Sequence, residues 1–139
     1  MEGGLSDYLI TNALNHTFAT GTFAKPTGLK LHLYTGDPFD GGTEVSAVVD
    51  DTAYASQSIT FDNEGVTSAM RVYNNALITF PAVIYGSGAA PYDVWGWVVK
   101  DGSGNILAGS NFAGAISRVA GEPMAMNIGA IYVEVTRTL

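Results

Sequence analysis

Five carboxylates within fifteen residues are the side chains in this sequence most suited to chemistry: Asp37, Asp40, Glu44, Asp50 and Asp51. Closely spaced carboxylates supply the hard oxygen ligands that Ca²⁺ prefers. This run, however, lacks the spacing and the final bidentate glutamate of an EF-hand loop. We therefore expect a solvated, mobile loop that is kept soluble by its charge, and no metal site.

Catalysis by other groups is limited by the composition, because the chain has two histidines and no cysteine. Thiolate zinc sites, Fe–S clusters and thiol nucleophiles are excluded. His16 and His32 lie in no nucleophile motif, and two histidines cannot form a three-histidine zinc site. A glycosidase needs two carboxylates about 5 to 10 Å apart, and Asp93 has no identifiable partner. We expect no catalytic residue, no cofactor and no enzymatic activity.

Four aromatic residues, Tyr85, Tyr92, Trp95 and Trp97, offer a second kind of chemistry. Flat apolar faces with polar rims suit saccharides, so these side chains could form a platform for sugar stacking. Successive side chains of a strand alternate, so Trp95 and Trp97 are expected on one face. That face has two further interpretations, as part of the core or as the anchor of a subunit interface.

One helix is predicted near the start of the chain, over residues 6–18. Ser6 has a side chain suited to the N-cap, and Gly21 is expected to close the helix. We expect this helix to cover one face of the strand over residues 94–99. The apolar stripe at helical spacing comprises Leu5, Leu9, Ala13, Leu14 and Phe18.

Beyond Gly28 the pattern is typical of short strands separated by Gly, Pro, Asn and Asp. Alternation places Leu29, Leu31 and Leu33 inward in one strand, and Ile131, Val133 and Val135 inward in the last. Turns are predicted at residues 62–65 and 101–104. The other expected strands cover residues 53–61, 66–72, 75–80, 94–100 and 105–112.

These patterns predict an all-β fold, an antiparallel β-sandwich or jelly roll of about eight strands with one short N-terminal helix. Helical segments do not separate the strands, so βαβ units are not expected. At 139 residues the chain suits a single domain spanning residues 1–139, with the sandwich at about 29–137.

Charge restricts the classes of partner. The net charge is −7, and only 14% of residues are charged, against roughly 25% in an ordinary soluble domain. We infer that part of the surface lies against another subunit. Six dispersed Lys and Arg residues exclude a nucleic-acid footprint. No apolar run suits a membrane span, and the first residues lack signal-peptide features, so synthesis in a cytoplasm is expected.

Several short motifs occur in an order that resembles a known family. They are Leu-Ser-Asp-Tyr-Leu at residues 5–9, Leu-x-Leu-x-Leu-Tyr-Thr-Gly-Asp-Pro at 29–38, Tyr54, Asn-Asn-Ala-Leu-Ile-Thr-Phe-Pro-Ala at 74–82, Val-Trp-Gly-Trp-Val-Val-Lys-Asp at 94–101 and Gly-Asn-Ile-Leu-Ala-Gly at 104–109. The chain resembles a family of small tailed-bacteriophage virion proteins. Some members are labelled tail-fibre-like, and some resemble capsid cement proteins with a jelly-roll fold.

The resemblance implies a structural protein without catalytic residues. It implies a capsid cement protein on the exterior of the virion, bridging neighbouring copies of the major capsid protein and self-associating, most simply as a dimer. The alternative is a tail-fibre or host-surface carbohydrate-binding module. The residues expected at interfaces are Leu5, Tyr8, Phe39, Tyr85, Tyr92, Trp95 and Trp97.

Overall fold

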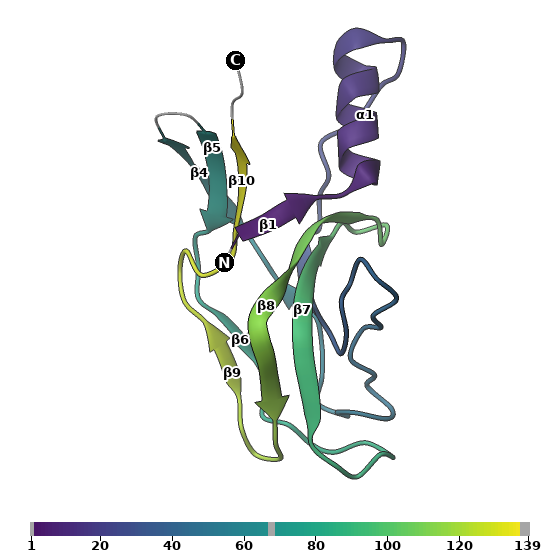
Figure 1. Ribbon diagram of the computed structural model, residues 1–139, viewed down its shortest axis with the longest axis vertical. Coiled ribbons are helices and arrows are strands. Elements are labelled where there is room, and N and C mark those ends of the chain that lie inside the picture. Colours follow the sequence, from purple (N-terminus) through teal and green to yellow (C-terminus); the bar gives the residue numbers. More distant parts are fainter. Residues whose placement is uncertain (1, 67–68, 137–139) are drawn as a thin grey trace.

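The computed structural model describes residues 2–66 and 69–136. Within these residues the chain forms one helix and ten strands (Figure 1). No helix in this part of the chain is long and apolar enough to cross a membrane. The elements are β1 (Glu2–Leu5), α1 (Asp7–Phe18), β2 (Lys30–Tyr34), β3 (Gln57–Ser58), β4 (Phe61–Val66), β5 (Ala69–Asn74), β6 (Ile78–Phe80), β7 (Tyr92–Lys100), β8 (Ile106–Arg118), β9 (Met124–Met126) and β10 (Tyr132–Thr136).

The strands form a curled eight-stranded sheet in the order β3-β2-β7-β8-β1-β10-β5-β4, together with a two-stranded sheet of β6 and β9. The predicted all-β, sandwich-like fold is confirmed. The short strand β1 was not predicted, and it pairs antiparallel with β8 and parallel with β10. It therefore joins the strands of the body to a projecting three-stranded arm of β10, β5 and β4 (Figure 1).

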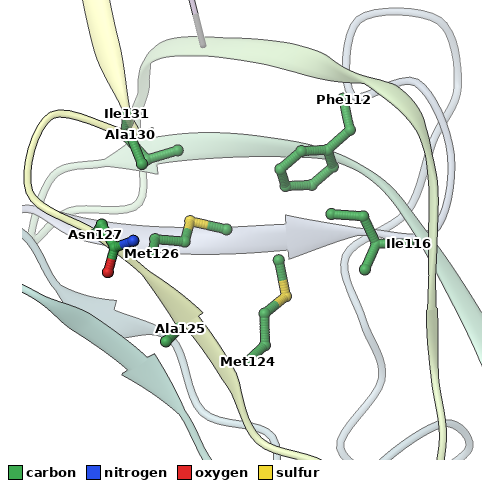
Figure 2. Close-up of a pocket in the computed structure, with 8 residues that line it drawn as sticks. All are labelled: Phe112, Ile116, Met124, Ala125, Met126, Asn127, Ala130 and Ile131. Carbon is green, nitrogen blue, oxygen red and sulfur yellow. The ribbon is translucent and has the colours of Figure 1, made fainter.

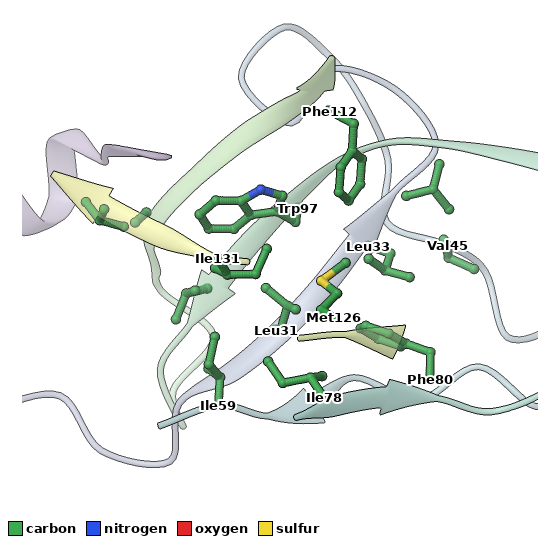
Figure 3. Close-up of a cluster of buried hydrophobic side chains, with 14 of the residues drawn as sticks. Leu31, Leu33, Val45, Ile59, Ile78, Phe80, Trp97, Phe112, Met126 and Ile131 are labelled. Carbon is green, nitrogen blue, oxygen red and sulfur yellow. The ribbon is translucent and has the colours of Figure 1, made fainter. Parts of the chain in front are cut away.

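The core lies inside the curl of the sheet and is closed by the β6–β9 pair (Figure 3). Leu31 and Leu33 are fully buried, which confirms the alternation predicted for β2. Trp97 is also fully buried and is the largest such side chain. The backbone of β1 passes directly over its ring, and a Cβ at Gly3 would overlap the indole. This crossing therefore requires glycine at position 3.

The prediction that Trp95 and Trp97 share a face is wrong. Trp95 is 47% exposed, whereas Trp97 is fully buried. The pairing of β7 with β8 is irregular between Val94, which pairs with Ile116, and Gly96, which pairs with Asn111. An advance of two residues on β7 therefore corresponds to five residues on β8. A bulge of this kind changes the direction of the next side chain. Strict alternation is lost there, and one tryptophan lies outside while the other lies in the core.

Helix α1 begins as predicted, but it does not cover β7. The Ser6 hydroxyl accepts the Leu9 N–H at 3.2 Å and donates to the Ile106 carbonyl at 2.5 Å. The helix ends at Phe18, as predicted, but its C-cap is Ala19 rather than Gly21. It contains no buried residue, and it projects from the same end of the body as the arm (Figure 1). The predicted packing on the sheet fails because α1 contacts the body only near its base.

Two boundary predictions also fail. Residues 62–65 were expected to form a turn, yet they lie within β4, which pairs with β5 from Phe61 to Val66. Of residues 53–61, only Gln57–Ser58 and Phe61 lie in strands. The strand expected at residues 66–72 includes residues 67 and 68, which lie outside the described residues. In β10 Val133 is buried as predicted, but Val135 is 52% exposed because it lies beyond the body, on the arm.

Candidate functional site

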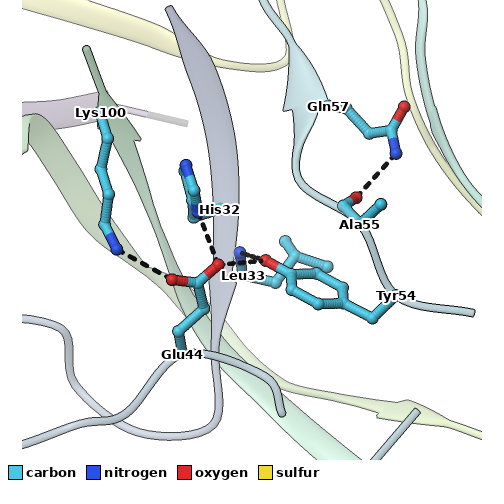
Figure 4. A network of polar contacts seen from close by, with 7 residues as sticks. All are labelled: His32, Leu33, Glu44, Tyr54, Ala55, Gln57 and Lys100. Atoms are coloured by element: carbon cyan, nitrogen blue, oxygen red, sulfur yellow. Dashed lines mark hydrogen bonds and ion pairs between the residues drawn. The ribbon is translucent and has the colours of Figure 1, made fainter. Parts of the chain in front are cut away.

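The densest polar cluster surrounds Glu44, on the outer side of β2 and β7 (Figure 4). One carboxylate oxygen lies 2.6 Å from His32 Nδ1 and accepts the Tyr54 hydroxyl at 3.1 Å. The other oxygen accepts Lys100 Nζ at 2.9 Å. The Tyr54 hydroxyl in turn accepts the Leu33 N–H at 3.0 Å. Three side chains from separate parts of the chain therefore hold one carboxylate.

These contacts fix the charge of the cluster. Burial alone would raise the pKa of Glu44, but hydrogen bonds from His32 and Lys100 outweigh it and lower the pKa to about 2. Burial also raises the pKa of the Tyr54 hydroxyl. At neutral pH Glu44 is thus an ionised carboxylate with both oxygens hydrogen-bonded, and Tyr54 is a neutral donor. This arrangement suits a clamp that holds the loop containing Glu44 on the sheet, rather than a group that exchanges protons with a substrate.

The clamp predicts a loss of stability in acid. The pKa of Glu44 is lower in the folded chain, so its stabilisation is present above the unfolded value of about 4.5 and is lost as the pH falls toward 2. Because the side chain is 31% exposed, solvent screening reduces the effect to about 1 to 2 kcal/mol. Urea denaturation of wild type and Glu44→Gln should show this difference at pH 7 and a much smaller one near pH 2.

Glu122→Gln is the matched control for this measurement, because Glu122 is an exposed glutamate in a turn. Its stability should follow that of wild type throughout the same pH range. A difference between wild type and Glu44→Gln that stays constant down to pH 2 would show that the Glu44 carboxylate does not act through its charge.

The five clustered carboxylates do not form one solvated loop, and for Asp51 this prediction is wrong. Asp51 is 1% exposed, and its carboxylate accepts the N–H groups of Ala53 and Ile84 and the Tyr92 hydroxyl. Asp50 accepts the Ser46 N–H at 2.8 Å. Asp37 accepts the Phe39 N–H, which lowers the pKa of Asp37. No three His, Cys, Asp or Glu side chains of the described residues lie together as metal ligands would.

The four aromatic residues do not form the platform that was one interpretation of their spacing. Trp97 is in the core, and Tyr92 is 9% exposed with its hydroxyl 3.0 Å from Asp51. Burial, together with the hydrogen bond to Asp51, outweighs the opposing contact with Arg118 and raises the pKa of Tyr92 to about 12. Both side chains are therefore covered within their own chain, and neither adds to an exposed aromatic face. Trp95 is exposed and Tyr85 is partly exposed. Asp93 is also exposed, as a solvated strand residue would be.

The other expected interface residues lie at separate places. Leu5 lines an apolar pocket at the base of α1. The Tyr8 ring meets the edge of Phe23, 6.1 Å away between centroids. Phe39 is 54% exposed, and its ring occupies space left by Gly109. Contact of these residues with a partner remains a prediction.

Two of the pockets formed by the described residues are lined mainly by apolar side chains. The first, of about 230 Å³, lies between β8 and β9 and is lined by Phe112, Ile116, Met124 and Met126, with Asn127 at one end (Figure 2). The second, of about 160 Å³, lies between the base of α1 and the arm. Neither is lined by an ionisable side chain, and both are smaller than ordinary ligand pockets of about 300 Å³ or more. Their size and chemistry suit apolar side chains.

Sequence reasoning missed the exposed apolar surface at the projecting end of the molecule. On α1, Ile10, Leu14 and Phe18 are 41%, 53% and 82% exposed. On the arm, Met70 and Val135 are 54% and 52% exposed. The spacing of four residues from Ile10 to Phe18 was a visible signal. The apolar stripe was interpreted as a buried face, however, because sequence spacing does not show whether a helix has a partner.

The family described as Podophage GP4 fiber I protein gp80 matches residues 4–134 of the chain. A search of curated proteins found no match. Because the family match covers almost the whole chain, this protein belongs to the podophage GP4 fiber I protein gp80 family, a family of phage virion proteins.

Proposed function

We propose that this protein is a non-catalytic subunit of a phage fibre that acts through protein–protein contacts. The observation that carries the proposal is helix α1, which projects into solvent without a buried residue and exposes Ile10, Leu14 and Phe18. An isolated helix of this length is marginal in water. Exposed apolar ridges of this kind are typical of interaction sites.

Two features support a structural role rather than catalysis. The Glu44 carboxylate is ionised, and three side chains already contact it. The two apolar pockets offer no group that could donate or accept a proton. A carbohydrate-binding role is less well supported, because Tyr92 and Trp97 lie inside the protein.

Location in a fibre is favoured by the description of the family. The capsid cement role is a second candidate, favoured by the motif resemblance at residues 29–38 and 94–101. In that case the same apolar surface would contact the major capsid protein on the exterior of the virion. The acidic net charge of −7 suits either exterior position.

Separating purified virions into tails and heads tests the proposal. Mass spectrometry of each fraction should find the protein with tails and fibres, and antibody labelling should mark the same structures in electron micrographs. Recovery with tail-free heads, together with fragile heads in a deletion mutant, would instead establish the cement role. Absence from virions would refute both roles.

A further inference from the structure

The arm has one charged face and one apolar face. Strands β10 and β5 place Val133 opposite Val72 and Val135 opposite Met70. Alternation puts these four side chains on one face. On the other face, Arg71 donates to Glu134 at 2.7 and 2.9 Å, and its guanidinium lies over the Tyr132 ring. The arm is therefore an amphipathic sheet, whose apolar face requires a covering layer.

In the part of the chain that the structure describes, this covering layer is present only at the base of the arm. Val72 and Val133 line the apolar pocket there, together with Leu5 and Leu9 from the start of α1. Farther along the same face, Met70 and Val135 are each more than half exposed. The apolar face thus continues from the covered pocket to an uncovered tip.

Helix α1 has an uncovered surface too, because none of the described elements covers its apolar ridge of Ile10, Leu14 and Phe18. The returning segment, residues 19–28, packs on the polar side, where the Phe23 N–H donates to His16 Nδ1 and the Phe23 ring meets Tyr8. Ile10, Leu14 and Phe18 lie about 100° to 180° around the helix from Leu9. Leu9 lines the apolar pocket at the base of the arm, so the ridge lies on a different side of the helix from that pocket.

The two uncovered surfaces match in length and charge. A helix of 12 residues is about 18 Å long, and strands of five or six residues span about 17 to 20 Å. Residues 8–24 contain no Asp, Glu, Lys or Arg. In an acidic chain, such a neutral segment allows two copies to approach without repulsion between carboxylates.

We propose that the α1 ridge of one copy packs on the apolar face of the arm of a second copy, and that the second copy reciprocates. Both surfaces lie at the same end of the molecule (Figure 1), as a two-fold exchange requires. The occupant is α1 of an identical chain, and its ridge of Ile10, Leu14 and Phe18 contacts Met70 and Val135. This inference rests on the proposed function in one respect, that the subunit acts through protein contacts.

Charge substitution tests the contact. Sedimentation equilibrium should give wild type twice the 14.6 kDa subunit mass. Leu14→Glu should weaken the dimer by at least about 30-fold, as expected for a central apolar contact. Asn15→Glu is the matched control, an exposed neighbour on another side of α1, and should remain dimeric. Circular dichroism verifies that each variant folds, and Met70→Glu provides an independent disruption from the arm.

Crosslinking identifies the occupant, because the chain has no cysteine of its own. Mixing Leu14→Cys with Val135→Cys and oxidising should yield a disulfide-linked heterodimer. Asn15→Cys mixed with Val135→Cys should not. A crosslink in Leu14→Cys alone, without the mixed product, would show helix-to-helix pairing and overturn the proposal.

A wild-type mass of one or three subunits would also overturn the two-fold exchange. That outcome is independent of whether the protein is found in virions. A monomer recovered from fibres would refute this contact and leave the proposed function intact. A dimer absent from virions would refute the proposed function and leave the contact intact.

Discussion

Replacing Trp97 by alanine is expected to lower the free energy of unfolding by about 3 to 5 kcal/mol. The indole is fully buried, and β1 crosses it at Gly3. Its Nε1 has no hydrogen-bond partner among the described residues, so its contribution comes from packing. The cavity left behind would also loosen β1, which joins β8 to β10. Urea denaturation measures the loss, and the melting temperature should fall by about 10 to 15 °C.

Trp95→Ala is the matched control. It removes the same type of side chain two residues away in the sequence, at a position where the tryptophan is 47% exposed. Its cost should stay within about 1 kcal/mol. Equal losses from the two variants would contradict the assignment of one tryptophan to the core and the other to the surface. A Trp97→Ala protein that stays folded but loses only its assembly would show that Trp97 is an interface anchor instead.

Asp51→Ala is expected to cost about 3 to 5 kcal/mol, for a different reason. The carboxylate accepts three hydrogen bonds of 2.9 to 3.0 Å, from the Ala53 and Ile84 N–H groups and from the Tyr92 hydroxyl. Each donor left without a partner in a buried site costs about 1 to 3 kcal/mol, and local relaxation recovers part of the sum. Arg118, which is 3% exposed, would also lose a nearby negative charge. Thermal and urea unfolding both measure this loss.

Asp40→Ala is the control, since Asp40 comes from the same acidic run and is exposed. It should change the free energy of unfolding by less than about 0.5 kcal/mol. Tyr92→Phe should fall between the two, because it removes one of the three bonds to Asp51. If Asp51→Ala proved as mild as Asp40→Ala, Asp51 would be solvated, as the sequence pattern suggested.

Several features were predicted correctly because their cause is local. The Ser6 cap and the apolar spacing after it placed α1 to within one residue at its start. Alternation in β2 identified Leu31 and Leu33 as core residues. The residues at 101–104 form the predicted hairpin turn, with Lys100 paired to Ile106. Each of these depends on neighbours within a few positions, which a sequence pattern displays directly.

The candidate site was predicted less well because burial depends on distant parts of the chain. Glu44 and Lys100 are 56 positions apart, and Asp51 and Tyr92 are 41 apart. Nothing in the acidic run distinguishes Asp51, which is buried, from Asp40, which is exposed. The bulge that separates Trp95 from Trp97 likewise arises from the pairing of β7 with β8.

By itself, then, the sequence determined the all-β class, the position of the helix and the scarcity of charge, since these follow from composition and short-range periodicity. Only the tertiary structure decided which tryptophan is covered, which carboxylates are held, and that the apolar ridge of α1 and the face of the arm both remain open. The physical reason is that an apolar stripe shows a need for burial, whereas its partner is selected by the path of the whole chain.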